Sequence, residues 1–257
     1  MKFKFGLLLL IALVAIGFAS RKDFPNGEWI DLSYDFSAET IYWTTDDGFR
    51  KETVAEGKTP QGYYYSSYKI STPEHGGTHL DAPIHFAENG RPADRVPLTD
   101  LIGPAVKIDI SVKASADRDY AMTVNDVAAW EKKNGRIPDG AIVLIQTGYG
   151  KFWPDRTKYM GLEGEVKHFP SLGPDAARWL VANRKIRAAG IDTASIDVGV
   201  STTFETHVAL MTKNVPAFEN VANMDKLPEK GFQIVALPMK IKDGSGGPLR
   251  IVAFLPE

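Results

Sequence analysis

Three of the five histidines in this chain fall within eleven residues, in the segment His75–His85, which reads HGGTHLDAPIH. The segment also carries one carboxylate, Asp81. Neutral imidazole and carboxylate are good ligands for zinc, manganese and related divalent ions, and a carboxylate can also bridge two ions. These residue types, so close together, predict a metal site. The alternative is a set of surface or core histidines with a capping aspartate, and the density of ligands makes it the weaker interpretation.

The backbone around these residues must bring their side chains together. Adjacent Gly76 and Gly77 disfavour a helix, so the helical pair of zinc-binding histidines four residues apart is not expected. If the chain is extended from His79 to Asp81, both side chains point to the same face. A bend at the two glycines would then let His75 join them.

His85 follows Pro83, where the chain can take a new direction and bring this third imidazole over the same point. Histidine titrates near neutral pH, so His85 could move protons at the site. His85 is therefore a candidate for proton transfer at the site.

Composition bounds what else the chain can be. It has 257 residues, of which 44% are hydrophobic and 24% charged, as is usual for one globular domain. The net charge of -2 offers no cationic field for nucleic acid, so nucleic-acid binding is not expected. Cysteine is absent, which excludes disulfides, thiol nucleophiles, iron–sulfur clusters and thiolate zinc sites.

The first residues have the pattern of a secretory signal peptide. Lys2 and Lys4 precede an uncharged, mostly aliphatic run over 5–19, which is shorter than the roughly 20 residues a membrane-spanning helix needs. Small residues at Gly17 and Ala19 predict cleavage after Ala19. We expect residues 1–19 to be removed and 20–257 to be exported, to a periplasm, a lumen or the medium, without a membrane anchor. An uncleaved anchor is the alternative.

The rest of the chain alternates short apolar runs with helical patterns, which indicates an α/β fold. A capping-box pattern at Thr123 and Asp126 precedes one helix, and Pro174 sits in the first turn of another. We expect strands near 29–34, 63–70, 105–110, 141–146, 231–241 and 249–255, and helices near 127–133, 174–183 and 201–214.

The segment HGGTHLDAPIHF closely resembles the signature of the cyclase-type metal hydrolases, a family that includes bacterial kynurenine formamidase and isatin hydrolase. The resemblance runs from Trp29 to Phe254. A second piece is His207, followed twelve residues later by Glu219, a spacing found in the kynurenine formamidase branch. The sequence DTASID at 192–197 also looks like family sequence.

The resemblance implies a set of site residues and partners. The family fold is a single-domain swivelling β/α/β arrangement with a mixed sheet, usually dimeric, so a homodimer is expected. Kynurenine formamidases carry two zinc ions and isatin hydrolase uses manganese, so we expect one or two Zn²⁺ ions, with Mn²⁺ as the alternative. Asp81 would be shared between two ions and His85 would shuttle protons. The implied ligands are His75, His79, Asp81, His207 and Glu219.

The resulting functional hypothesis is metal-dependent hydrolysis of a C–N amide bond in a small aromatic amide. The first choice of reaction is arylformamidase-like, N-formylkynurenine to kynurenine and formate. The alternatives are isatin hydrolase-like opening of a cyclic amide or lactone, and a secreted metal-binding protein without catalysis.

Several other residues could have a role. Thr78 could hold a ligand by a hydrogen bond, or its hydroxyl could stabilise a turn. Gly244–Pro248 lacks the lysine of a P-loop and is interpreted as a turn, and His168 as an ordinary loop histidine. Aromatic side chains that could line a substrate pocket are Tyr42, Trp43, Tyr63, Tyr64, Tyr65, Phe86 and Trp153.

Overall fold

The computed structural model describes residues 26–257. The predicted signal peptide, 1–19, lies outside the described residues, so its prediction stands as made. Within the described part of the chain, no helix is both long enough and apolar enough to cross a membrane.

The centre of the molecule is a mixed sheet that closes on itself. Strand β12 pairs with β11 on one side and with β4 on the other, so seven strands form a barrel-like ring and β1 attaches to β12 from outside. The run β5-β7-β9-β10 is parallel and the remaining pairings are antiparallel. The strands of this sheet are β1 (Gly27–Asp31), β4 (His79–Asp81), β5 (Ile102–Asp109), β7 (Ile142–Gln146), β9 (Ala188–Ile191), β10 (Ala217–Glu219), β11 (Phe232–Pro238) and β12 (Gly246–Pro256).

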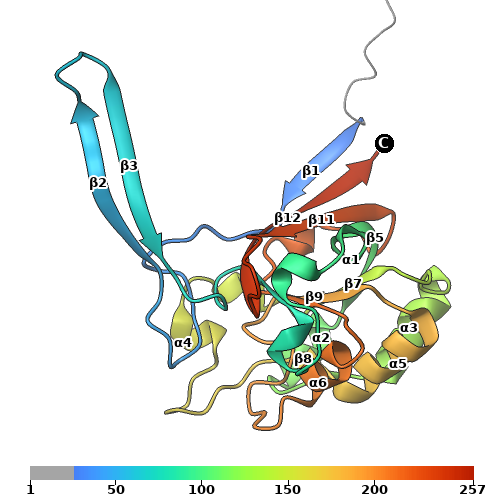
Figure 1. Ribbon diagram of the computed structural model, residues 1–257. Coiled ribbons are helices and arrows are strands. Elements are labelled where there is room, and N and C mark those ends of the chain that lie inside the picture. Colours follow the sequence, from blue (N-terminus) through green and yellow to red (C-terminus); the bar gives the residue numbers. More distant parts are fainter. Residues whose placement is uncertain (1–25) are drawn as a thin grey trace, which may run out of the picture.

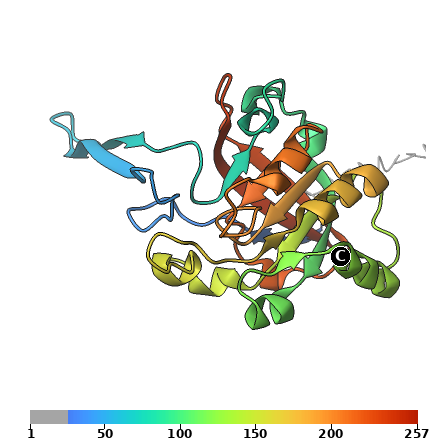
Figure 2. The ribbon, with the colours of Figure 1, turned by 90° about the horizontal axis from the view of Figure 1, so that it is seen from below.

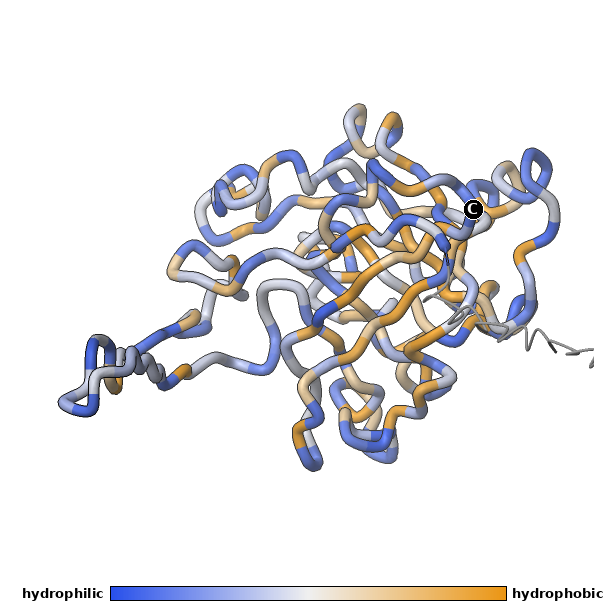
Figure 3. Tube along the Cα trace, turned by 90° about the horizontal axis from the view of Figure 1, so that it is seen from above, coloured by the Kyte–Doolittle hydropathy of each residue, from blue (hydrophilic) through white to orange (hydrophobic). Residues whose placement is uncertain are grey.

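Strand β7 shows why the centre of the sheet is so apolar. Its first four residues are all buried, as expected for a parallel strand covered on both faces. Ile142 and Leu144 pack with residues of the other ring strands, inside the barrel. Val143 and Ile145 point the other way, into a second core beneath the helices. Figure 3 shows the hydrophobic stretches gathered in these central strands.

Three helices cover the outer core, as Figures 1 and 2 show: α3 (Val124–Asn134), α5 (Pro174–Arg184) and α6 (Glu205–Met211). The predicted capping box of α3 is present, with Thr123 and Asp126 each bonding the other's backbone. The prediction of a helix over 201–214 was too long. Phe204 adopts a left-handed backbone (φ 50°), and α6 begins only after it.

The prediction of a strand over 29–34 was shifted along the chain, because β1 begins at Gly27 and ends at Asp31. The Asp31 carboxylate accepts the Ser33 backbone N–H, and this local turn ends β1. Likewise β11 ends at Pro238, which cannot donate to a neighbouring strand. The smaller elements are α1 (Leu98–Leu101), α2 (Ser111–Ala116), α4 (Arg156–Tyr159), β6 (Ala121–Met122), β8 (Ser171–Leu172), and the 3-10 turns Pro83–His85, Ala93–Arg95, Tyr149–Phe152 and Met224–Lys226.

A long hairpin of β2 (Arg50–Lys58) and β3 (Tyr64–Ser71) projects from the body (Figure 1). Tyr63, Tyr64 and Tyr65 lie on it, and each is more than half exposed. The sequence predicted a strand here but missed its partner, β2, whose charged and small residues carry a weak β signal. The fold as a whole is the predicted single α/β domain with a mixed sheet.

Candidate metal centre

Strand β4 carries the first half of the site. His79 and Asp81 are two residues apart on an extended strand, so they share a face, as predicted, while Leu80 between them is fully buried in the barrel core. Strand β4 pairs antiparallel with β10, and this register places Glu219 opposite His79. The pairing of two three-residue strands thus brings together a histidine and a carboxylate that are far apart in the sequence.

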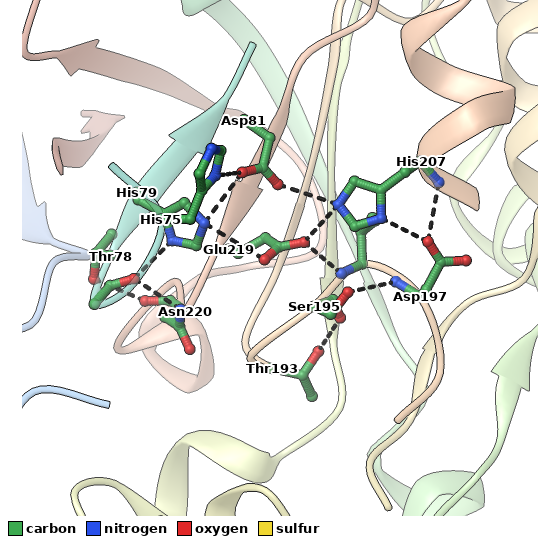
Figure 4. A network of polar contacts seen from close by, with 12 residues as sticks. His75, Thr78, His79, Asp81, Thr193, Ser195, Asp197, His207, Glu219 and Asn220 are labelled. Atoms are coloured by element: carbon green, nitrogen blue, oxygen red, sulfur yellow. Dashed lines mark hydrogen bonds and ion pairs between the residues drawn. The ribbon is translucent and has the colours of Figure 1, made fainter. Parts of the chain in front are cut away.

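Helix α6 supplies the second histidine of the buried cluster. The His207 ring points from α6 toward β4 and β10 (Figure 4). The Asp197 carboxylate accepts hydrogen bonds from the backbone N–H groups of Thr206 and His207, at 2.7 and 3.1 Å, and so caps the start of this helix. The same carboxylate accepts the His207 Nδ1–H at 2.6 Å. One acid therefore fixes both the helix and its ring.

The five predicted ligands converge in two groups that share Asp81. Asp81 Oδ1 lies 2.6 Å from His75 Nδ1 and 3.1 Å from His79 Nε2. Asp81 Oδ2 lies 3.3 Å from His207 Nε2, and Glu219 Oε1 lies 3.2 Å from the same nitrogen. Within each group, His75–His79–Asp81 and Asp81–His207–Glu219, the potential ligand atoms lie within 4.8 Å of one another. The position of Asp81 is that expected of a shared ligand.

The hydrogen bonds behind the rings decide which nitrogens face the cluster. His79 Nδ1 lies 2.9 Å from the Gly77 carbonyl oxygen, which can only accept, so Nδ1 carries the proton and Nε2 presents a lone pair. The bond from His207 Nδ1 to Asp197 has the same consequence for His207 Nε2. Lone pairs and carboxylate oxygens thus face one another, and positive charge is needed among them. This donor set fits a divalent metal ion.

The electrostatics of the cluster lead to the same conclusion. Burial and the nearby Asp81 charge raise the pKa of the Glu219 carboxyl. Burial disfavours the charged form of His79, but the Asp81 and Glu219 carboxylates outweigh it and raise the pKa of His79 to about 9. A buried site that draws a proton onto imidazole so strongly also attracts a divalent cation.

His85 lies over the cluster rather than in it. Its ring stacks on His75 with centroids 3.9 Å apart and stands edge-on to His207 at 5.9 Å. Although the residue is exposed to the cavity, the surrounding groups bury much of the ring, and this lowers the pKa of His85 below its usual value. The imidazole is therefore neutral at pH 7 and can accept a proton.

A cavity of about 320 Å³ opens over these side chains. Its aromatic walls are Tyr42, Trp43, Phe86 and Phe204. No lysine or arginine occurs among the described residues that line it. The Tyr42 ring reaches the site because Gly76 has no side chain; a Cβ there would lie 2.1 Å from that ring.

Not every aromatic residue considered from the sequence belongs to this cavity. The proposed pocket role was wrong for Tyr63, Tyr64 and Tyr65, which lie on the projecting hairpin, and for Trp153, which stacks on Tyr34 with centroids 4.0 Å apart. Aromatic side chains serve core packing as readily as binding, and composition cannot separate these uses. Phe204 does line the cavity, but the sequence placed it in the helix expected near 201–214 and gave it no pocket role.

Thr78 acts on the backbone rather than on a ligand side chain. Its hydroxyl donates to the Asn220 carbonyl at 2.7 Å, and the Asn220 side chain donates back to the Gly77 carbonyl at 2.7 Å. These bonds tie the residues next to His79 to the residue after Glu219. His168, by contrast, does not belong to this centre. Its Nδ1 lies 2.8 Å from Asp119 Oδ2, in keeping with the interpretation of a loop histidine.

The fold and the site together define an α/β protein with a buried histidine and carboxylate centre suited to divalent metal. Residues 30–198 match the family described as "Putative cyclase", and the chain belongs to this cyclase family. It is 33% identical to isatin hydrolase of Roseibium aggregatum over 193 residues, 72% of this chain and 73% of the relative. It is 27% identical to kynurenine formamidase of Bacillus cereus over 231 residues, 88% and 97% of the two chains.

The structural comparison agrees with the sequence comparison. The solved structure of isatin hydrolase A from Ralstonia solanacearum superposes with a TM-score of 0.83 at 29% identity, covering 89% of this chain and 92% of the other. The similarity therefore extends over most of the chain, and it confirms the resemblance drawn from the motif.

Proposed function

We propose that this protein hydrolyses the C–N bond of a small aromatic amide, with divalent metal held at the centre described above. The observation that carries the proposal is the convergence of imidazole lone pairs and carboxylate oxygens beside an aromatic cavity. The ligands would be His75, His79, Asp81, His207 and Glu219.

Zn²⁺ is the metal that this set of nitrogen and oxygen donors suits best, with Mn²⁺ as the alternative. When bound, such an ion supplies a lowered pKa for water and polarisation of a carbonyl group. The two donor groups give room for two ions, and Asp81, placed between them, would be shared. The proton on Nδ1 of His79 and of His207 keeps both Nε2 atoms free for this role.

His85 would move the proton that hydrolysis requires. Its neutral imidazole accepts a proton from the attacking water and returns it to the leaving nitrogen, which becomes an amine. Stacking on His75 and contact with Phe86, whose ring centroid is 4.5 Å away, hold the His85 ring at the cavity wall. Such general acid–base assistance contributes about 10² to 10⁴ in rate.

A cyclic aryl amide such as isatin is the substrate that the cavity supports best. Isatin is flat, aromatic and uncharged, and the lining offers aromatic rings without a cationic side chain to hold an anion. The greater identity to an isatin hydrolase, 33% against 27% for the kynurenine formamidase, supports the same choice.

An N-formyl aryl amide is the second candidate, and a separate observation favours it. His207 and Glu219 complete the inner donor group, and their spacing is the one that resembles the kynurenine formamidase branch. Asp46, at the cavity, would suit the ammonium group of an amino-acid substrate such as N-formylkynurenine.

Metal analysis coupled to parallel assays tests the proposal. The purified protein is loaded with Zn²⁺ or Mn²⁺ and assayed on isatin and on N-formylkynurenine, together with an ester and a lactone. We expect hydrolysis of at least one of the two amides, abolished by exhaustive chelation and restored by metal. Protein with stoichiometric metal and no hydrolysis of any of these would instead be a metal-binding protein without catalysis. Activity that survives chelation would contradict the proposal.

Export and dimerisation are further proposals that rest on the sequence. Cleavage after Ala19 predicts an intact mass that begins at Ser20 in the exported protein, and retention of residues 1–19 would contradict it. A homodimer, proposed from the family resemblance, predicts twice the chain mass in sedimentation equilibrium. Neither proposal involves a nucleic acid or a membrane as partner.

A further inference from the structure

His75 is held differently from the other two histidines of the centre. His79 and His207 are almost fully buried, and a carbonyl and a carboxylate lie directly behind their rings. The His75 side chain is 24% exposed, and the group behind it is a hydroxyl: His75 Nε2 lies 2.8 Å from Ser245 Oγ. A hydroxyl can donate or accept, so by itself it does not fix which nitrogen of His75 carries the proton.

Glu74 removes that ambiguity. Its Oε2 atom lies 2.6 Å from Ser245 Oγ and 2.9 Å from the Ser245 backbone nitrogen. A carboxylate can only accept, so the Ser245 O–H donates to Glu74 and the Ser245 oxygen accepts from His75 Nε2–H. His75 Nδ1 then faces Asp81 Oδ1 at 2.6 Å, and with a cation bound at this group it would present its lone pair to that cation.

Backbone hydrogen bonds hold Ser245 beside strand β4. The Ser245 carbonyl accepts the Ala82 N–H at 2.8 Å, and the next residue, Gly246, pairs with Asp81 in the β12–β4 ladder. Gly246 also leaves space for the His75 ring, because a Cβ there would lie 2.6 Å from His75 Cε1. The sequence indicated that the stretch Gly244–Pro248 is a simple turn. It is instead partly strand, and its Ser245 contacts the ring of His75, a proposed metal ligand.

We propose that Ser245 and Glu74 are positioning residues for the metal centre, which set the tautomer and orientation of His75 and so the metal affinity of the group His75–His79–Asp81. The inference rests on the proposed metal site but not on the identity of the substrate. Partners behind a metal-binding histidine change metal affinity by about 10- to 100-fold when they are removed.

The test measures Zn²⁺ affinity by competition with a chromophoric chelator. Ser245→Ala should weaken binding of the ion at the outer group by about 10- to 100-fold, while the second ion binds as in the wild type. Glu74→Ala should weaken it as well, and Glu74→Gln, whose carbonyl oxygen still accepts from Ser245, should recover most of the affinity. Ser115→Ala is the matched control, because the Ser115 hydroxyl bonds only locally, to the Val112 carbonyl at 2.8 Å.

A second readout separates positioning from general stability. At one fixed Zn²⁺ concentration, nitrogen-15 shifts of the His75 ring should report a proton on Nε2 throughout the wild type, and a mixture of tautomers in Ser245→Ala, where part of the protein has lost the outer ion. If Ser245→Ala does not fold, the comparison of Glu74→Ala with Glu74→Gln decides the question by the same two measurements. Unchanged affinity and an unchanged tautomer in these variants would overturn the inference. A wild-type protein that binds neither Zn²⁺ nor Mn²⁺ would instead overturn the proposed function.

Discussion

The two donor groups that meet at Asp81 are built on different principles. The three residues of the inner group, Asp81–His207–Glu219, are almost fully buried at the floor of the cavity, and the Asp197 carboxylate lies behind the histidine ring. The outer group, His75–His79–Asp81, opens to the cavity through His75 and depends on a serine hydroxyl. As proposed, Asp81 would therefore be shared between an almost fully buried group and one that is partly exposed through His75.

Removing Asp81 should have the largest effect, because both donor groups would lose a ligand at once. Asp81→Ala deletes the ligand common to both, and we expect loss of metal from the whole centre together with loss of hydrolysis. Elemental analysis of the purified variant checks the first part and the amide assay the second. Full metal occupancy would show that the two groups do not depend on the shared carboxylate.

Removing His85 should leave both groups loaded and slow the reaction. We expect His85→Ala to keep its metal and to lose about 10² to 10⁴ in kcat, the range for a lost general acid–base. Metal content and steady-state kinetics are measured on the same preparation. Wild-type turnover in this variant would rule out the proton-transfer role.

Removing the charge of Asp197, the acceptor behind His207, should weaken the inner group and leave the outer group unchanged. In Asp197→Asn the charged acceptor of the His207 Nδ1–H is lost, and we expect about 10- to 100-fold weaker metal binding at the inner group only. Chelator competition measures the affinity, with the exposed Asp175→Asn as the control. An equal loss at both groups would mean that they are not separable sites.

The smallest effect is expected at Asp126, a buried carboxylate outside the centre whose oxygens accept hydrogen bonds from other side chains and from the backbone. Burial opposes ionisation of Asp126, but bonds from Lys113, Thr123 and Tyr120 outweigh it and lower the pKa of Asp126, whereas the pKa of Glu219 is raised. Because the pKa is lower in the folded state, the stabilisation is present above the unfolded-state pKa and is lost as pH falls through the folded value.

Asp126→Asn should therefore reduce the free energy of unfolding by about 1 kcal/mol at pH 7, the usual size of a lost helix cap. The difference from the wild type should begin to shrink below about pH 4, the unfolded-state pKa of aspartate, and should shrink further as the pH falls through the lowered folded-state pKa of Asp126. Urea denaturation at the two pH values measures it. A difference that does not change with pH would mean that the charge of Asp126 contributes nothing.

Local patterns predicted local structure well. The capping box at Thr123 and Asp126, the proline start of α5 and the buried run of β7 form as expected, because each depends on residues that are neighbours in the chain. The extended backbone from His79 to Asp81 was predicted for the same reason. The projecting hairpin was half missed because its stability does not come from burial of its own side chains.

The parts of the site that escaped prediction depend on contacts between distant residues. Asp197 lies in the DTASID stretch, and a metal-binding histidine needs an acceptor behind it, yet nothing in the spacing shows that Asp197 reaches His207. Ser245 is 170 residues from His75, in a glycine-rich stretch that reads as a turn. Each of the two residues accepts a hydrogen bond from a histidine ring. Such a contact between distant residues cannot be recognised from a sequence pattern.

The sequence by itself determined which donors this protein has: three histidines and an aspartate in one short segment, a later histidine and glutamate, and no thiol. Only the tertiary structure decided how they meet. Asp81 and His207 are 126 residues apart, and the pairing of β4 with β10 and the capping of α6 by Asp197 bring them into contact. The reason is physical: side-chain chemistry is a property of each residue, whereas the direction of a lone pair is set by whatever the fold places behind it.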